Sequence, residues 1–286
     1  SDIVKTINTF KPTDIYLPHP CDNHPDHYAT YCFVSAALEQ IYSNDHESGI
    51  KMHTYIVHRG DWPVPKGDRP REPLAPPHGL VQTNTKWYSL PLSPDIAARK
   101  RAAVADYATQ MDVEKNFLVS FARSNEIFGN NPVRQIVSVP PSQITIDGFH
   151  DDWFGIPPAV IDTVGDYVMP ELSKGGDVRA VYMCRDDKYL YMRLDCVRPL
   201  SKRLTYCINF RGIATPDKSD RFSVTIRLPS GVKTDNVIWA SQKNTLEIAI
   251  PLNEIEFDRT LFVQVQTKLM RVTVDNTGWH EIETGL

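Results

Sequence analysis

Residues 13–30 read TDIYLPHPCDNHPDHYAT and join an apolar run, a turn rich in histidine and aspartate, and the start of a helix. The run from Thr13 to Leu17 is typical of a short buried strand, and apolar side chains recur at helical spacing from Tyr28 to Ile41. Ligands of open α/β sheets bind where a strand ends and the chain turns into a helix. The stretch therefore predicts an α/β fold with a binding site in the turn at residues 18–27.

The turn itself has the composition of a metal site. Its nine residues from 19 to 27 hold three histidines and two aspartates, namely His19, Asp22, His24, Asp26 and His27. A neutral imidazole is a good zinc ligand, and a nearby carboxylate can fix its tautomer. A second histidine can instead stabilise an oxyanion as the imidazolium. The alternative is a solvated polar turn in which an aspartate caps the helix.

The rest of residues 1–135 continues to alternate between helix-like and strand-like segments. Asp2 to Phe10 has helical spacing, and the run from His53 to His58 predicts another strand. Residues 59–92 contain seven prolines and predict a long irregular loop, which in a compact domain is often functional or mobile. Ser93-Pro94-Asp95 is a helix start, and this helix is expected to continue to Met111.

After Pro140-Pro141 the pattern changes to period-two runs such as RAVYMCR, YLYMRLDCV and TLEIAIP. About eight short runs of this kind, separated by turn residues, predict an all-β antiparallel sandwich. The expected domains are residues 1–135 and 142–286, joined by a short linker from Pro132 to Pro141.

Three segments resemble one enzyme family. TDIYLPHPCDNHPDHYAT resembles the second signature of the LmbE/PIG-L deacetylases, in which a strand is followed by His-Pro-Asp-His and a helix. SPDIAARKRAAVADYATQM is similar to the family's lysine- and alanine-rich helix with a Tyr-x-x-Gln end, and FARSNEIFG resembles its closing segment. The segments lie in the family's order and span roughly residues 1–130. The resemblance implies a Rossmann-like sheet and hydrolysis of an N-acetyl group, usually on an amino sugar.

The resemblance also implies roles for three residues of the turn. His27 corresponds to a zinc ligand. His24 corresponds to the group that stabilises the tetrahedral oxyanion or protonates the leaving amine, and Asp26 would orient one of the histidines. A bound zinc ion lowers the pKa of its water to about 7 and polarises the acetyl carbonyl.

One decisive element of the family pattern is absent from the 286 residues. The first signature, His-Pro-Asp-Asp, supplies two zinc ligands and the general base, and a catalytic zinc needs about three protein ligands. The first half of the parallel sheet is missing too, which would expose an apolar edge and face. We therefore expect a partial, Rossmann-like sheet that belongs to a larger enzyme, with the chain as a cleavage product, a truncated form or one half of a split assembly. The chain alone is expected to be inactive.

Other candidates for the site are less specific. His58 lies at a predicted strand end and could face the site, or it could be an ordinary loop histidine. Trp62 and Trp87 flank the proline-rich loop and could stack on a sugar ring, although tryptophan is also common in packing. Arg123 and Glu126 are three residues apart and are expected to form a structural pair.

The run ITIDGFHDDW, followed by a strand and then DDKYLY, resembles the DOMON-like, family-nine-type carbohydrate-binding modules. This second resemblance covers most of residues 142–286 and implies a domain that binds glycans or only braces the deacetylase. Trp153, Trp239 and Trp279 are candidate sugar contacts, and Trp153 could equally fill the core. Four aspartates could bind calcium, namely Asp147, Asp152, Asp166 and Asp177. Their favoured interpretation is turn formation, because aspartate bonds to the backbone of turns.

Composition narrows the partners. The net charge is −4 and no basic run occurs, which argues against nucleic acid or an anionic membrane as the main partner. No apolar stretch reaches the ~18 residues of a membrane span. The five cysteines form no CxxC pair, and we interpret Cys184, Cys196 and Cys207 as buried thiols, with one disulfide left open. An N-acetylated sugar or glycoconjugate is the expected substrate, which weakly favours an extracytoplasmic setting. The alternative function is a non-catalytic carbohydrate-binding protein with a remnant deacetylase scaffold.

Overall fold

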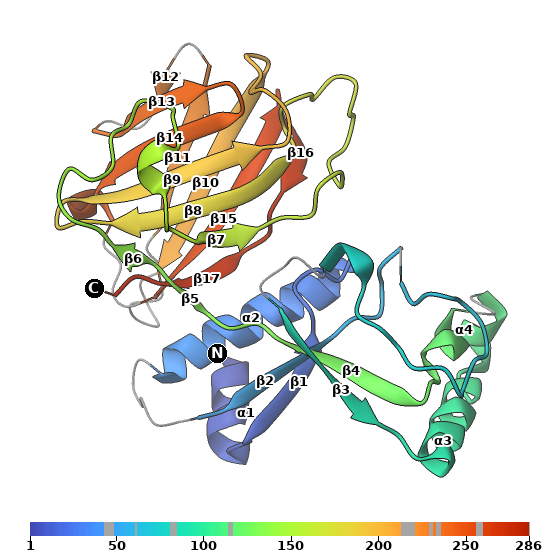
Figure 1. Cartoon of the computed structure of the whole chain (residues 1–286). Helices are drawn as coiled ribbons and strands as arrows, with labels where there is room; N and C mark the ends of the chain where they lie inside the picture. The colour runs from blue at the N-terminus through green and yellow to red at the C-terminus, as the bar shows by residue number, and fades with distance from the viewer. Residues whose placement is uncertain are drawn as a thin grey trace. The chain divides into compact units, whose positions relative to one another are not determined.

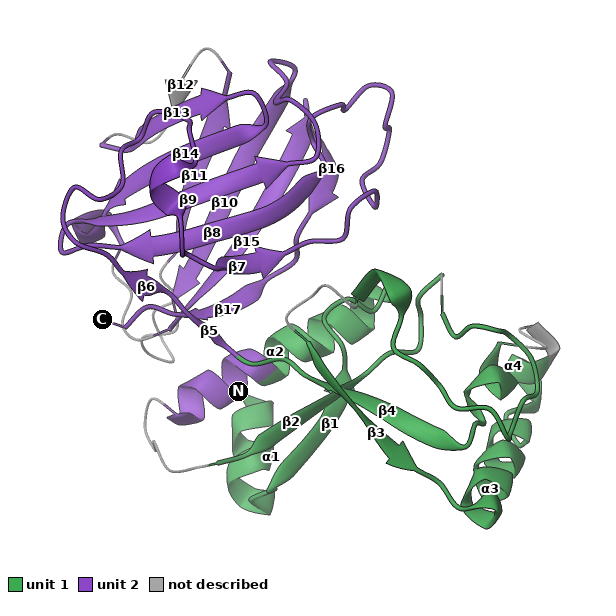
Figure 2. Cartoon of the chain, in the orientation of Figure 1, with its two compact units in different colours: residues 1–34, 48–132 green, residues 35–47, 133–286 purple. Residues whose placement is uncertain are grey.

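The computed structural model describes residues 1–42, 49–60, 62–80, 85–113, 117–212, 221–228, 231–232, 236–255 and 260–285. The molecule is mixed α/β and consists mostly of sheets (Figure 1). Its chain divides into two compact units, residues 1–34 with 48–132 and residues 35–47 with 133–286 (Figure 2).

The first unit is built around a four-stranded sheet. Its elements are α1 (Asp2–Phe10), β1 (Asp14–Pro18), the first part of α2 (Pro25–Tyr42), β2 (Lys51–Tyr55), η1 (His78–Leu80), β3 (Lys86–Pro91), α3 (Pro94–Ala105), α4 (Ala108–Val113), η2 (Leu118–Phe121) and β4 (Asn125–Asn130). From residue 35 onward α2 belongs to the second unit. The strand order is β1-β2-β4-β3. β1 and β2 are parallel, in register from Asp14 opposite Lys51 to Pro18 opposite Tyr55, whereas β4 runs antiparallel to both of its neighbours.

The predicted helix boundaries in this unit follow from capping. α1 begins after Ser1, whose side chain accepts a hydrogen bond from the amide of Val4, and it ends at Lys11 in the left-handed conformation, directly before Pro12. Ser93 caps α3 in the predicted way by accepting a hydrogen bond from the amide of Ile96. The helix expected to continue to Met111 is instead two helices, because α3 ends at Ala105 and α4 begins at Ala108.

The proline-rich segment is held in place by polar contacts from the strands and helices beside it. The indole of Trp62 donates a hydrogen bond to the carbonyl of Ala75 (2.8 Å). Asn125 accepts a hydrogen bond from the amide of Leu74 (2.6 Å) and returns one to its carbonyl (3.0 Å). The fully buried Arg123 donates to the carbonyls of Ser120 and Pro65. These bonds satisfy backbone groups that a regular element would satisfy itself. The described part of this long segment is therefore ordered, and its last residues form β3.

The predicted pair between Arg123 and Glu126 is wrong. Helical spacing would bring them together, but the chain leaves η2 after Phe121 and enters β4 at Asn125. Glu126 pairs with Lys100 of α3, and Arg123 lies 3.5 Å from a carboxylate oxygen of Glu72. The expected pair fails because its spacing rule holds only within a helix.

The second unit contains two sheets of mostly antiparallel strands. Its elements are β5 (Arg134–Gln135), β6 (Val137–Ser138), η3 (Asp151–Trp153), β7 (Pro158–Ile161), β8 (Val178–Arg185), β9 (Tyr189–Cys196), β10 (Leu204–Gly212), β11 (Arg221–Arg227), β12 (Gly231–Val232), β13 (Ile238–Gln242), β14 (Thr245–Pro251), η4 (Leu252–Glu254), β15 (Thr260–Leu269), β16 (Val272–Asn276) and β17 (His280–Glu283). One sheet has the order β12-β11-β10-β15-β17-β5 with β16 on β15, and the other has the order β13-β14-β9-β8-β6 with β7 on β8. The arrangement agrees with the predicted sandwich.

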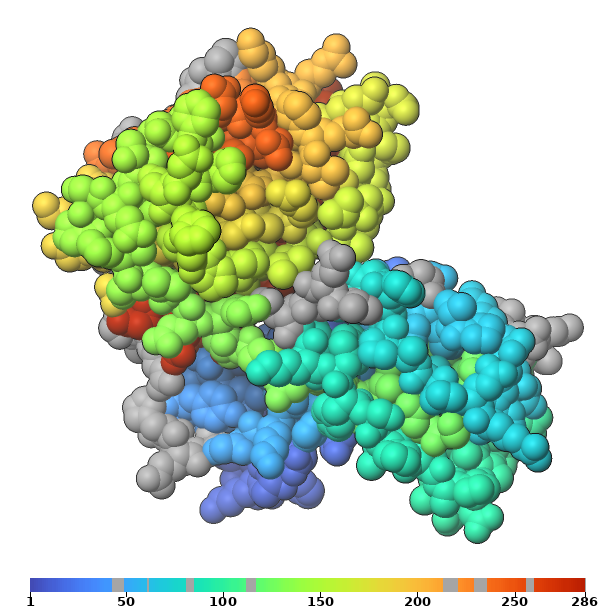
Figure 3. Space-filling view, in the orientation of Figure 1, coloured from blue at the N-terminus to red at the C-terminus, as the bar shows by residue number. Residues whose placement is uncertain are grey.

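The main core of this unit lies between the two sheets. Met192 and Leu194 of β9 are fully buried there together with Ile208 of β10 and Val265 of β15. A smaller core lies on the opposite face of the six-stranded sheet, where Trp153 packs with Tyr191 and its neighbours. The segment leading up to β7 covers this face (Figure 3). Burial on both faces explains why β9 and β14 are buried along nearly their whole length.

The cysteines and the helices bear on two expectations from the sequence, a possible disulfide and the lack of a membrane span. None of the five cysteines forms a disulfide, and Cys184, Cys196 and Cys207 are buried as predicted. Among the described residues, no helix combines the length and the apolar character that crossing a bilayer requires.

Asn125 offers a test of what orders the proline-rich segment. Replacement by alanine (Asn125→Ala) leaves the amide and carbonyl of Leu74 without partners, at a cost of about 1–3 kcal/mol. We expect trypsin to cleave after Lys66 and Arg71 about tenfold faster in the native variant, because local opening becomes easier. The exposed Asn130, at the end of the same strand, is the control, and Asn130→Ala should leave the rate unchanged. Equal cleavage of both variants and the parent chain would contradict the assignment.

Candidate functional site

The histidine-aspartate turn lies at the edge of the sheet where the two parallel strands end. β1 ends at Pro18 and β2 ends at Tyr55, which are paired in the sheet. Beyond them the two segments continue to bond, because the amide of His19 donates to the carbonyl of Tyr55 (2.7 Å) and the amide of Asn23 donates to the carbonyl of His58 (2.6 Å). α2 begins at Pro25, three residues before the predicted Tyr28. His27 therefore lies in the first turn of a helix.

A buried carboxylate, Asp22, holds the two segments together. One of its oxygens accepts hydrogen bonds from the amides of Val57 (2.8 Å) and His58 (3.0 Å), and the other accepts one from the amide of His24 (3.0 Å). Burial alone would raise the pKa of Asp22, but these hydrogen bonds outweigh it and hold the pKa below its usual value. Asp22 is therefore an ionised carboxylate inside the site.

Asp22 also determines how His27 presents its ring. Nδ1 of His27 lies 3.1 Å from Oδ1 of Asp22. This nitrogen makes no hydrogen bond of good geometry, so the contact is an electrostatic one. A carboxylate at this distance favours the proton on Nδ1, which leaves the lone pair of Nε2 available to a metal ion. The carboxylate beside His27 is Asp22, whereas the predicted orienting residue, Asp26, has an exposed side chain.

His24 has the opposite tautomer preference. Its Nδ1 accepts a hydrogen bond from the backbone amide of Asp26 (3.2 Å), so in the neutral ring the proton resides on Nε2. A ring of this tautomer is a hydrogen-bond donor at Nε2 rather than a metal ligand there. His24 and His27, three residues apart, thus favour different tautomers, with a proton on Nε2 in His24 and a lone pair on Nε2 in His27.

His58 is the third histidine of the cluster. The ring centroids of His24 and His27 are 4.8 Å apart, and the centroid of His58 lies 5.2 Å from each of them. Phe117 stacks on His58 with a centroid distance of 5.9 Å. His58 lies three residues beyond β2, so the predicted strand to His58 is shorter than expected and leaves the residue in the turn beside the cluster.

The two tryptophans predicted to contact a sugar take different positions. Trp62 is only 4% exposed and packs in the core with Leu74 and Ile127, so its indole has no free face for stacking. Trp87 is half-buried and stacks on His19 at a centroid distance of 5.2 Å. His19 itself is buried, and its Nε2 lies 2.8 Å from the hydroxyl of Thr85. We therefore interpret His19 and Trp62 as structural.

The cluster supplies only part of a metal site. Within the described ranges, the one group of three acidic, histidine or cysteine side chains whose ligand atoms approach closely enough to share an ion is in the sandwich, not here. His27 offers a free nitrogen and Asp22 supports it, which fits one ligand of a zinc site. The remaining ligands of such a site are not supplied by the described residues.

A polar chain on the same sheet has no counterpart in the sequence predictions. Nε2 of His53 lies 2.7 Å from Oδ1 of Asp14, and the hydroxyl of Tyr88 bonds to Nδ1 of the same ring. The hydrogen bond from His53 is the main cause that lowers the pKa of Asp14. The three residues come from β1, β2 and β3, so only the strand pairing brings them together. No local sequence signal could have revealed them.

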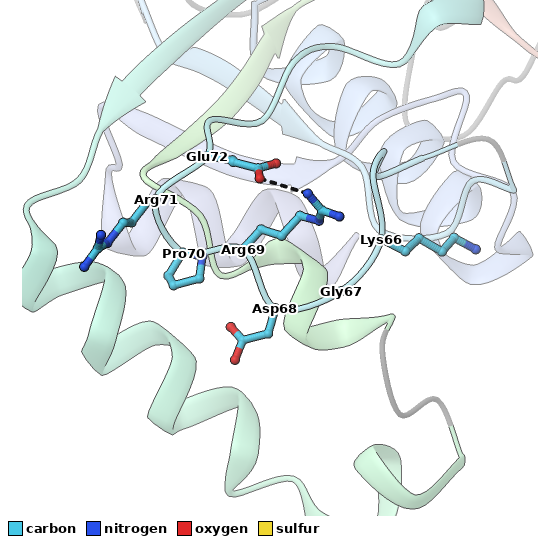
Figure 4. A pocket seen from close by; sticks show the side chains of 7 residues that line it. All are labelled: Lys66, Gly67, Asp68, Arg69, Pro70, Arg71 and Glu72. Atoms are coloured by element: carbon cyan, nitrogen blue, oxygen red, sulfur yellow. Dashed lines mark hydrogen bonds and ion pairs between the residues drawn. The ribbon is translucent and has the colours of Figure 1, made fainter.

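Residues 66–72 line an open hollow on the surface (Figure 4). Three of its charged side chains make ion pairs, because Nη1 of Arg69 lies 2.9 Å from Oε1 of Glu72 and the guanidinium of Arg101 binds Asp68. None of the predicted site residues lines the hollow. We assign it no function.

The role of Asp22 can be tested through stability. Asp22→Asn replaces an acceptor oxygen by an NH₂ group that faces backbone donors, which should lower the free energy of unfolding of this unit by about 1–3 kcal/mol at pH 7. The pKa of Asp22 is lower in the folded state, so its contribution is present above the unfolded pKa of about 3.9 and is lost as pH falls through the folded pKa. The difference between variant and parent in urea unfolding should therefore narrow below about pH 4. Asp26→Asn is the exposed control, and an equal loss in both variants would contradict the role.

Comparisons with known proteins leave the site to be interpreted from its geometry. No protein-family model matches the chain, and the searches of curated proteins and of solved structures returned no significant match.

Proposed function

We propose that the chain forms part of a zinc-dependent N-deacetylase of the LmbE/PIG-L type that hydrolyses the N-acetyl group of an amino sugar or glycoconjugate. The observation that carries the proposal is the pairing of His27 with the buried, ionised Asp22, beside His24 and His58. A carboxylate that orients a histidine is the usual support of a zinc ligand. The sequence resemblance supplies the reaction class, and the ring orientations fit the roles it implies.

Each side chain has a defined task in this proposal. His27 would hold the zinc through Nε2, while Asp22 keeps the proton of the ring on Nδ1. A bound zinc ion supplies an activated water and polarises the acetyl carbonyl. Of the two roles that the resemblance implies for His24, stabilising the oxyanion or protonating the leaving amine, its tautomer fits the first, in which Nε2 would donate a hydrogen bond to the developing oxyanion. The products are acetate and the free amino sugar. His58 and the half-buried Trp87 are proposed substrate contacts.

The proposed site is shared with further polypeptide. A catalytic zinc requires about three protein ligands, and the described residues bring one oriented imidazole to it. The sheet agrees with this, because β1 is an edge strand and pairs only with β2 in the described part of the chain. Tyr16 on β1 is 57% exposed and Phe33 on α2 is 65% exposed, as expected for surfaces that more protein covers. We propose that the Rossmann-like sheet and the ligands of the His-Pro-Asp-Asp signature are completed by that polypeptide.

Substitution of the two histidines separates their roles. The test uses the chain fused to a segment that supplies the His-Pro-Asp-Asp signature. Two quantities are measured: the zinc that stays bound after dialysis, and the acetate released from N-acetylglucosamine. His27→Ala should lose both the bound zinc and the release of acetate, because it removes a zinc ligand. His24→Gln should keep the zinc and lower kcat by about 100-fold or more, as expected for loss of a hydrogen-bond donor to the oxyanion.

The exposed His78, in η1, provides a matched control, and His78→Ala should change neither reading. Full zinc content and turnover in His27→Ala would refute the proposal. Full turnover by the 286 residues alone would refute the shared site.

The carbohydrate-binding alternative rests on exposed rings in the second unit. Trp153 is 2% exposed and donates to Glu247, so it does not offer a face to a sugar. Phe149 and Phe154, on either side of η3, are 49% and 93% exposed. Exposed aromatic rings are suited to stacking on sugars. Glycan binding by this surface is compatible with either a catalytic or a remnant first unit.

A glycan array probed with the whole chain tests this alternative. If the surface around η3 binds a sugar, Phe154→Ala should abolish the signal because it removes the most exposed ring. Met270, which is 82% exposed in the same unit, is the control, and Met270→Ala should bind as the parent does. Silence of the parent chain across the array, with and without calcium, would instead favour a bracing role.

A further inference from the structure

Three aspartates of the second unit converge, two from one loop and a third from a strand more than 100 residues later in the sequence. Asp162 directly follows β7, Asp166 lies in the next loop, and Asp275 belongs to β16. One carboxylate oxygen from each lies within 4.8 Å of the other two. Calcium binds oxygen at roughly 2.4 Å, so two ligands on opposite sides of the ion are about 4.8 Å apart. The spacing therefore permits one ion to contact all three residues.

Asp162 is the member of the group that lacks a partner. Its Oδ1 accepts a hydrogen bond from the neighbouring amide of Thr163 (2.9 Å), whereas its Oδ2 is buried and has no hydrogen-bond partner. Buried carboxylate oxygens are normally satisfied, because desolvation without a partner is costly. This second observation is independent of the clustering and indicates that a ligand is required at Oδ2.

Backbone hydrogen bonds hold Asp275 itself and the loop that carries Asp166. Asp275 is 6% exposed and accepts hydrogen bonds from the amides of Val178 (2.7 Å) and Asn276 (2.8 Å). The loop that carries Asp166 is fixed by the amide of Gly165, which donates to the carboxylate of Asp177. The carboxylate of Asp275 and the loop that carries Asp166 are thus held before any ion binds, which reduces the entropy cost of binding.

Two of the three carboxylates, Asp162 and Asp275, share the same buried surroundings. Among the described residues, neither Asp162 nor Asp275 forms an ion pair with a lysine or arginine. Burial, with the charges of Asp166 and Asp177 added to it, raises the pKa of Asp275 to about 7. Burial and the charge of Asp275 raise the pKa of Asp162 well above its usual value. Such repulsion is relieved by a bound cation.

We propose that Asp162, Asp166 and Asp275 bind a calcium ion. The donor set is entirely carboxylate oxygen, which selects a hard cation over zinc or copper. Calcium accepts irregular oxygen shells completed by water, whereas magnesium demands a near-ideal octahedron. The ion would connect the β7–β8 loop of the six-stranded sheet to β16 of the seven-stranded sheet, and so would stabilise the sandwich by binding only the folded state.

Only one of the four aspartates predicted from the sequence belongs to this site. Asp147 instead accepts a hydrogen bond from the amide of Phe149 within its own turn, and Asp152 accepts one from the amide of Thr145. These contacts match the turn interpretation. Asp177 supports the loop, and Asp166 is the predicted residue that joins the group.

The proposal is tested with the whole chain after removal of metals by EDTA, using calcium chloride alone as the probe in calorimetry and thermal unfolding. The parent should bind calcium and its Tm should rise with calcium concentration. Asp166→Asn should weaken binding by about tenfold or more, because affinity follows the number of ligand charges. In EDTA, however, the same variant should have a higher Tm than the parent, because it removes repulsion. A purely structural role for Asp166 would give the opposite sign.

Asp166 is exposed, so Asp166→Asn is expected to fold, and far-ultraviolet circular dichroism checks this. The exposed Asp187, in the turn before β9, is the matched control, and Asp187→Asn should bind calcium as the parent does. Absence of calcium binding by the parent at millimolar concentration would overturn the proposal. Unchanged affinity in Asp166→Asn, or tighter binding of magnesium than of calcium, would overturn it as well. None of these outcomes depends on the histidine cluster, because calcium prefers oxygen ligands to imidazole.

Discussion

The site in the first unit depends on the burial of one negative charge, that of Asp22. Its carboxylate accepts hydrogen bonds from two amides beyond β2 and from one in the turn that precedes α2. Parallel strands have no direct connection at this edge of a sheet, so something other than the ladder must hold the two departing segments together. Asp22 does this and at the same time faces the imidazole of His27. Structure and proposed chemistry therefore share one carboxylate, and a change there affects both.

The sequence could predict what local rules determine. Ser93 and Pro94 start a helix, Pro12 follows the end of another, and alternating apolar residues mark the strands of the sandwich. It could not predict which residues meet across the fold. Arg123 and Glu126 are close in sequence yet pair elsewhere, and Trp62 lies in a core that its proline-rich surroundings did not indicate. In both cases the partner is more than 10 residues away, where helical spacing has no bearing.

The group of Asp162, Asp166 and Asp275 in the sandwich also could not be predicted from the sequence. Aspartates in turns are so common that residue type alone favours backbone bonding over metal binding, and for Asp147 that interpretation agrees with the contacts. What distinguishes Asp162 is an unsatisfied buried oxygen, and what adds Asp275 is the position of β16 beside the loop after β7. The amide of Val168 donates to the carbonyl of Val274 there (2.7 Å), which fixes the loop against the strand. Neither feature exists before the chain folds.

The two proposed ion sites differ in the chemistry of their donors, and this difference keeps them apart. Imidazole nitrogen favours zinc, and a group of carboxylate oxygens favours calcium. Each site is built on a residue whose charge is buried, but the charge is compensated differently. At Asp22 three backbone amides stabilise the ionised form, so the carboxylate can support His27 without an ion of its own. At Asp162 and Asp275 burial and repulsion raise the pKa, so in the proposed site a bound cation would supply the compensation. A carboxylate that the backbone already satisfies is suited to orient a ligand, and one that it leaves unsatisfied is suited to be a ligand.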